Sequence, residues 1–146
     1  MMTDLLLAIM HHIAIFALFA TLVAEIALVK VGIDFETARR VQKIDRLYGL
    51  LAACILIVGI ARVTFAAKGW YYYEHNAFFW CKMTTFLAIG LLSVPPTIRY
   101  LGWSRSGDQI SNGEVHAVRN YLWLQLGLFV PLLGFAAAMA RGYGSY

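Results

Sequence analysis

The stretch "LLLAIMHHIAIFALFATLVAEIALV", residues 5–29, decides the fold of this protein. It is long enough to cross the ~30 Å hydrocarbon core of a bilayer, which takes about 20 apolar residues. Its only ionisable side chains are His11, His12 and Glu25. We expect a retained membrane helix rather than a cleaved signal sequence, because no basic region precedes the stretch and its apolar run is too long.

Three more apolar blocks follow, so that the expected helices are residues 5–29, 47–67, 78–98 and 121–140. The chain is 61% hydrophobic and 14% charged, whereas soluble domains are about 45–50% apolar and about 25% charged. Only helices and closed barrels satisfy the backbone polar groups in lipid, and no strand-like alternation is present. The sequence therefore predicts an all-α integral membrane protein, with residues 1–146 forming a single four-helix transmembrane domain.

The two longer connections have different patterns. "VGIDFETARRVQKIDRLYG", residues 31–49, has helical periodicity after Asp34, a good N-cap residue, and predicts an interfacial helix between helices one and two. "WSRSGDQISNGEVHAVRN", residues 103–120, is rich in Gly, Ser and Asn and predicts an irregular, mobile loop. In the helices, Pro95 and Pro96 are expected to kink or end helix three, and Gln125 to hydrogen-bond between helices.

The positive charges predict the orientation. Eight cations lie between helices one and two or between helices three and four, and only Lys68 and Arg141 flank the other side. The eight are Lys30, Arg39, Arg40, Lys43, Arg46, Arg99, Arg105 and Arg119. Positive loops stay on the cytoplasmic side. We therefore expect a multi-pass protein of the bacterial cytoplasmic (inner) membrane with both termini on the periplasmic side. The net charge of +4 comes from these loops, and no basic-aromatic groove indicates nucleic-acid binding.

Four ionisable side chains are expected at one depth near the outer leaflet: His11, His12, Arg62 and Lys82. Each lies about 7–10 Å from the outer end of its helix at 1.5 Å per residue. No carboxylate is expected in this layer. Glu25 belongs near the inner face, where we expect it to pair with a cation such as Lys30 or Arg99, or else to serve a proton path.

Like charges in a low dielectric need a compensating partner, and an anionic ligand would supply it. Haem b fits, because His11 or His12 would be an axial ligand of iron and Arg62 and Lys82 would bind the propionates. His75, in the outer loop, would cap the site or ligate from above. A quinone, another porphyrin or a phospholipid headgroup would also suit the pocket. The plainer alternatives are that the two cations snorkel to the interface and that the histidines only pack.

The blocks "HHIAIFALFATLVAEIAL", "RLYGLLA", "GIARVTF", "YYYEHNAFFWCKMTTFLAIGLLSVPPT" and the terminal "ARGY" carry a resemblance over nearly the whole chain. They are similar to a family of small bacterial four-helix predicted membrane proteins of unknown function. The chain more distantly resembles the HemJ protoporphyrinogen oxidases and the CopD-like copper-resistance proteins. That likeness pairs a histidine of helix one with Lys82, which follows "FFWC", and implies b-type haem. The sequence departs from it in having no second membrane-embedded histidine on helices two to four.

The leading hypothesis is a b-type haem-binding membrane protein with a redox or porphyrin-related role, and thus a candidate membrane oxidoreductase. One alternative is a haem-free transporter or binding protein for an organic anion or lipid. Another is a structural or assembly subunit of a membrane complex. The sequence leaves open the substrate or electron partner, which of His11 and His12 faces the bundle, the second axial ligand and the number of haems. It also leaves open a homodimer, in which histidines related by symmetry would meet.

Overall fold

The computed structural model describes residues 2–65, 69–107 and 109–146. In these ranges the chain forms α1 (Met2–Leu28), α2 (Phe35–Phe65), α3 (Gly69–Glu74), α4 (Ala77–Ser106) and α5 (Asn112–Ala140). The four long helices are apolar and long enough to cross a membrane, which confirms the prediction of an all-α, four-span protein. Lys68, used in the orientation argument, lies outside the described residues.

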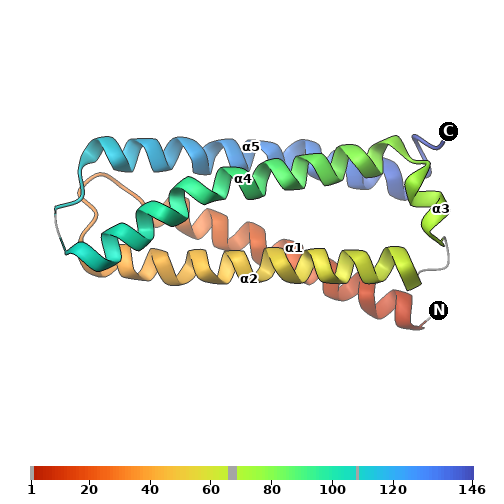
Figure 1. Ribbon diagram of the computed structural model, residues 1–146, viewed down its shortest axis with the longest axis horizontal. Helices are drawn as coiled ribbons and strands as arrows, with labels where there is room; N and C mark the ends of the chain where they lie inside the picture. The colour runs from red at the N-terminus through yellow and green to blue at the C-terminus, as the bar shows by residue number, and fades with distance from the viewer. Residues whose placement is uncertain (1, 66–68, 108) are drawn as a thin grey trace.

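The four long helices run up and down beside one another, and α3 lies across one end (Figure 1). Both termini lie at the end that carries α3, called here the terminal end, and the α1–α2 and α4–α5 connections lie at the opposite, loop end. The main packing is of α1 against α2 and of α4 against α5, with α2 also contacting α4. A chain that crosses a membrane four times has both termini on the same side, and here both termini lie at the same end of the bundle.

The bundle has a narrow core and an apolar outer surface. Leu22, Ile89 and Phe129 are among the side chains buried at its centre. Phe16 and Val130, by contrast, point outward and are more than 70% exposed. An apolar exterior of this kind is what lipid tails solvate. Cys54 and Cys81 also lie on the exposed surface and do not form a disulfide.

The segment that follows the first connection is helical, as its periodicity indicates, but it is not a separate helix. It forms the first turns of α2, which continues without a break to Phe65. Asp34 accepts a hydrogen bond of 3.1 Å from the N–H of Thr37, and its hydrogen bonds to Thr37 hold the pKa of Asp34 below its ordinary value. Ala38 and Val41 are fully buried, so this segment packs into the bundle instead of lying on its surface.

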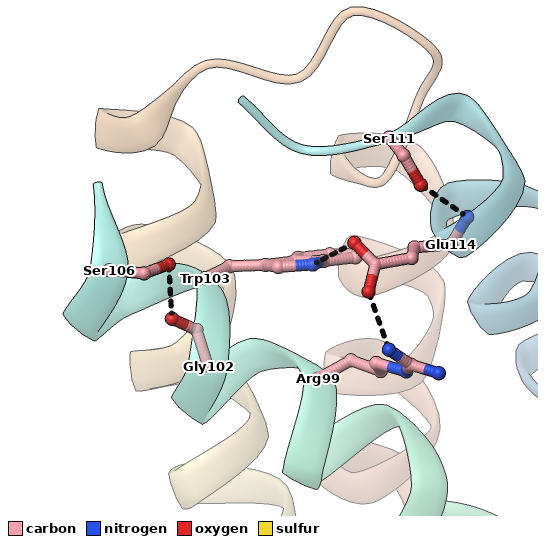
Figure 2. A network of polar contacts seen from close by, with 6 residues as sticks. All are labelled: Arg99, Gly102, Trp103, Ser106, Ser111 and Glu114. Atoms are coloured by element: carbon pink, nitrogen blue, oxygen red, sulfur yellow. Dashed lines mark hydrogen bonds and ion pairs between the residues drawn. The ribbon is translucent and has the colours of Figure 1, made fainter. Parts of the chain in front are cut away.

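The connection between α4 and α5 is much shorter than the irregular loop predicted from its composition. Arg99 of α4 forms an ion pair of 2.5 Å with Glu114 in the first turn of α5. The indole N–H of Trp103 donates a hydrogen bond of 3.3 Å to the same carboxylate (Figure 2). Ser111 caps α5 by accepting from the N–H of Glu114. These contacts join the two helices directly, so most of the predicted loop is helical.

Candidate functional site

A cavity of about 660 Å³ lies among α1, α2, α4 and α5 toward the terminal end. Its size falls in the range of small-molecule pockets, about 300–1,000 Å³. Most of its wall is apolar and includes Leu18, Phe86, Phe129 and Leu132, while aromatic side chains surround the end nearest α3. The four site residues predicted on the helices all line this cavity: His11, His12, Arg62 and Lys82.

The two histidines of α1 face different environments. His11 is half-buried and points at α2, where a Cβ placed on Gly59 would lie 3.6 Å from His11 Cε1. Its Nδ1 is buried and, among the described residues, has no hydrogen-bond partner. His12 is exposed, although it also lines the cavity. The ring planes are nearly perpendicular, at 89°, with centroids 6.4 Å apart. His11 is therefore the histidine that faces the bundle.

The tautomer of His12 follows from its one hydrogen bond. His12 Nδ1 lies 2.6 Å from the backbone oxygen of Ala8. A carbonyl oxygen only accepts, so a neutral His12 carries its proton on Nδ1 and its lone pair on Nε2. Histidines that ligate metals in proteins commonly hold the other ring N–H in this way.

The cationic layer contains a carboxylate, and the expectation that it has none is wrong. Asp4 Oδ1 lies 3.9 Å from Arg62 Nε, and Asp4 also lines the cavity. Because α1 begins at Met2, Asp4 lies two helical turns before His11 and on the same face. In the sequence, the signal is the spacing of seven residues between Asp4 and His11. The expected helix of residues 5–29 does not contain Asp4, whereas α1 begins at Met2.

Lys82 is the uncompensated cation of the site. Its Nζ lies 5.6 Å from the ring centroid of Phe79, a cation–π distance, and no described carboxylate forms an ion pair with it. Arg62 and Lys82 against Asp4 leave one positive charge, apart from the imidazoles. The cavity therefore combines a long apolar wall with a single excess cation.

The other two histidines lie outside this cavity. His75 stacks on Tyr71 with ring centroids 4.1 Å apart, and its Nδ1 donates to the backbone oxygen of Tyr71 at 3.1 Å. It is not part of the cavity wall. His116 is exposed in the first turns of α5, at the loop end. Neither histidine therefore lies where it could act as an additional ligand in the cavity.

At the terminal end, the C-terminal residues are held by contacts that the sequence does not predict. Asn76 is fully buried and caps α4 by accepting from the N–H groups of Phe78 and Phe79. Its amide donates to the backbone oxygen of Tyr143 at 3.0 Å, and Ala77 N–H donates to Gly144 O at 2.9 Å. These bonds fasten the last residues of the chain to the α3–α4 junction. No local periodicity signals them, because they join segments far apart in sequence.

Among the described residues, no group of three or more His, Cys, Asp or Glu side chains is placed to hold a metal ion. In the described ranges, His11 and His12 are therefore candidate single ligands and not members of a larger ligand cluster. A single imidazole suits a metal whose remaining ligands come from a macrocycle.

Comparison with known families finds a model that covers nearly the whole chain. The family model described as "Predicted membrane protein (DUF2214)" matches residues 3–144, and this confirms the first resemblance drawn from the sequence blocks. No curated protein and no solved structure matches the chain. The likeness to the porphyrinogen oxidases and CopD-like proteins stays a prediction.

Proposed function

The chain belongs to the DUF2214 family of predicted membrane proteins, and on that premise we propose that its terminal-end cavity binds an amphipathic anion, with haem b as the first candidate. The observation that carries the proposal is the chemistry of the cavity wall. In the part of the chain that the structure describes, His11 presents a buried ring nitrogen without a hydrogen-bond partner, and Lys82 presents an ammonium without an ion pair. The rest of the wall is mostly apolar. A ligand with a large apolar body and an acidic group satisfies all three features.

Haem b fits these residues in three respects. His12 has Nδ1 fixed on the Ala8 carbonyl, which leaves Nε2 as the nitrogen able to ligate iron. Lys82 and Arg62 would hold the propionates, with the buried Nδ1 of His11 as a further hydrogen-bonding group. When bound, haem b supplies one-electron redox chemistry. His75 is not in the cavity wall, so we assign it no part in holding the haem.

The test is the absorption spectrum of the protein, purified in detergent from cells supplied with ample haem, in the oxidised and dithionite-reduced states. We expect a Soret band and sharp reduced α and β bands. In His12→Ala, loss of the iron ligand should broaden or remove these bands. His11→Ala should bind haem more weakly but keep their shape. His116→Ala is the matched control, because His116 lies at the far end of the molecule, and it should behave as wild type.

A featureless spectrum from protein made with ample haem would refute haem binding. It would leave the second candidate, a haem-free binding or transport protein for a lipid or organic anion, which one observation favours. The cavity wall includes His12, an exposed residue of α1, so the cavity reaches the surface that lipid covers. Trp70 and Trp80 are also part of the wall. A brominated fatty acid should therefore quench the tryptophan fluorescence of the wild-type protein. Quenching should be weaker in Lys82→Gln and as strong as in wild type in the control variant Arg105→Gln.

A further inference from the structure

A second buried polar cluster lies in the half of the bundle toward the loop end, away from the cavity. It contains two carboxylates, Glu25 of α1 and Asp45 of α2, which are only 2% and 7% exposed. Two phenol groups accompany them, Tyr100 of α4 and Tyr48 of α2, which are also buried. Carboxylates this deeply buried in proteins are almost always paired.

Within the described residues, Glu25 has one hydrogen-bond donor and no ionic partner. The hydroxyl of Tyr100 donates to Glu25 Oε2 at 3.1 Å. The other carboxylate oxygen, Oε1, is buried without a hydrogen-bond partner among the described residues. The expected pairing of Glu25 with Lys30 or Arg99 is wrong, because Lys30 is exposed and Arg99 pairs with Glu114.

The charged groups packed around Glu25 do not neutralise it. On α5, Arg119 donates instead to the backbone oxygens of Ile26 and Val29, where it caps the end of α1. On α2, Asp45 is a second buried acid. Its partner Thr97 lies one helical turn before Tyr100, the partner of Glu25, so the two acids contact the same face of α4. Tyr48, also on α2, donates to Gln125. Asp45 Oδ1 accepts from the hydroxyl of Thr97 at 2.9 Å. The described residues place no cation within ion-pair distance of either carboxylate.

Two neighbouring carboxylates in a low-dielectric interior cannot both remain ionised without a counter-charge. We propose that Glu25 and Asp45 form a proton-binding site that holds a proton at neutral pH, with Glu25 Oε1 as its position. Tyr100 donates to the other oxygen of Glu25 and Thr97 donates to Oδ1 of Asp45. Glu25 Oε1 is the oxygen of these two carboxylates that is buried without a hydrogen-bond partner among the described residues, so we place the proton there. The site is an intramembrane proton acceptor, and its existence does not depend on what the terminal-end cavity binds.

The test is infrared spectroscopy of the whole protein in lipid at neutral pH, which resolves the C=O stretch of a protonated carboxylic acid from the bands of carboxylates. We expect such a band in wild type, lost in Glu25→Gln and shifted in frequency in Tyr100→Phe, which removes the hydrogen bond to Oε2. Glu36→Gln is the matched control. Glu36 is exposed and paired with Arg40, so this variant should keep the wild-type band.

A second measurement covers the case in which Glu25→Gln folds poorly. An apolar carbodiimide reacts with protonated carboxylic acids, and peptide mapping of labelled wild-type protein should find the adduct on Glu25 and not on Glu36. Raising the pH should reduce this labelling. The proposal is overturned if wild type has no protonated-acid band at neutral pH, or if the band persists in Glu25→Gln. It is also overturned if sodium ions abolish the band and the labelling at constant pH, because the site would then take a metal cation.

Discussion

The side-chain amide of Gln125, on α5, donates a hydrogen bond of 3.3 Å to the backbone oxygen of Leu92, on α4. Leu92 lies four residues before Pro96, which has no N–H to give to this oxygen. Gln125 is 1% exposed, and its own Oε1 accepts from the hydroxyl of Tyr48 on α2 at 3.0 Å. One amide thus joins three helices and replaces the donor that proline lacks. α4 continues through Pro95 and Pro96 to Ser106, so the prolines do not end it.

We predict that Gln125→Leu destabilises the protein by about 1–3 kcal/mol, the cost of leaving a buried polar group unsatisfied. Thermal unfolding in detergent measures it. Pro96→Ala provides the decisive comparison, because alanine restores an N–H to the helix. In a Pro96→Ala background Gln125→Leu should cost less, and an equal cost in both backgrounds would show that the bond to Leu92 does not stabilise the bundle.

Asp4 should weaken the binding of an anion in the terminal-end cavity, because it offsets the charge of Arg62 at 3.9 Å. Asp4→Asn should therefore tighten binding of the anion, and Arg62→Gln should weaken it. The pair is part-exposed, so each effect should stay below about 1 kcal/mol, or roughly fivefold in Kd. Titration of haem or fatty acid checks this, with Glu36→Gln as control. Weaker binding in Asp4→Asn would mean that Asp4 itself contacts the ligand.

Gly144→Ala should release the C-terminal tail from the α3–α4 junction. Gly144 has φ of +83°, and an added Cβ would lie 2.5 Å from Phe78 Cδ2. Gly142 has nearly the same φ, +82°, but open space around it. Gly142→Ala therefore introduces only the backbone strain, whereas Gly144→Ala introduces both the strain and the clash with Phe78. Hydrogen exchange at the Ala77 and Tyr146 amides, both bonded across this junction, should speed up more in Gly144→Ala; equal exchange in the two variants would contradict the docking.

The charge distribution predicts that the terminal end faces the periplasm. In a background free of Cys54 and Cys81, Glu74→Cys at the terminal end and Asn112→Cys at the loop end place single thiols at exposed positions. A membrane-impermeant maleimide added to intact cells with a permeabilised outer membrane should label Glu74→Cys. It should label Asn112→Cys only after the inner membrane is opened. The reverse pattern would overturn the orientation.

Much of the fold was predictable because the apolar blocks themselves have the length of a bilayer. Their spacing gave the four crossings and placed His11, His12, Arg62 and Lys82 at one depth, and all four line one cavity. Composition was misleading for the connection between helices three and four. Residues 103–120 looked irregular from their Gly, Ser and Asn content, yet the contacts of Arg99 and Trp103 with Glu114 hold most of them in α4 and α5.

The sequence by itself determined that the chain crosses a membrane four times as helices, because backbone groups in lipid must be satisfied within each segment. It also determined which depth each ionisable side chain reaches, because the rise of a helix is fixed. Only the tertiary structure decided which side chains meet: Asp4 with Arg62, Glu25 with Tyr100, Gln125 with the carbonyl that Pro96 leaves free. These pairs depend on the rotation of each helix about its axis, which is set by packing against its neighbours.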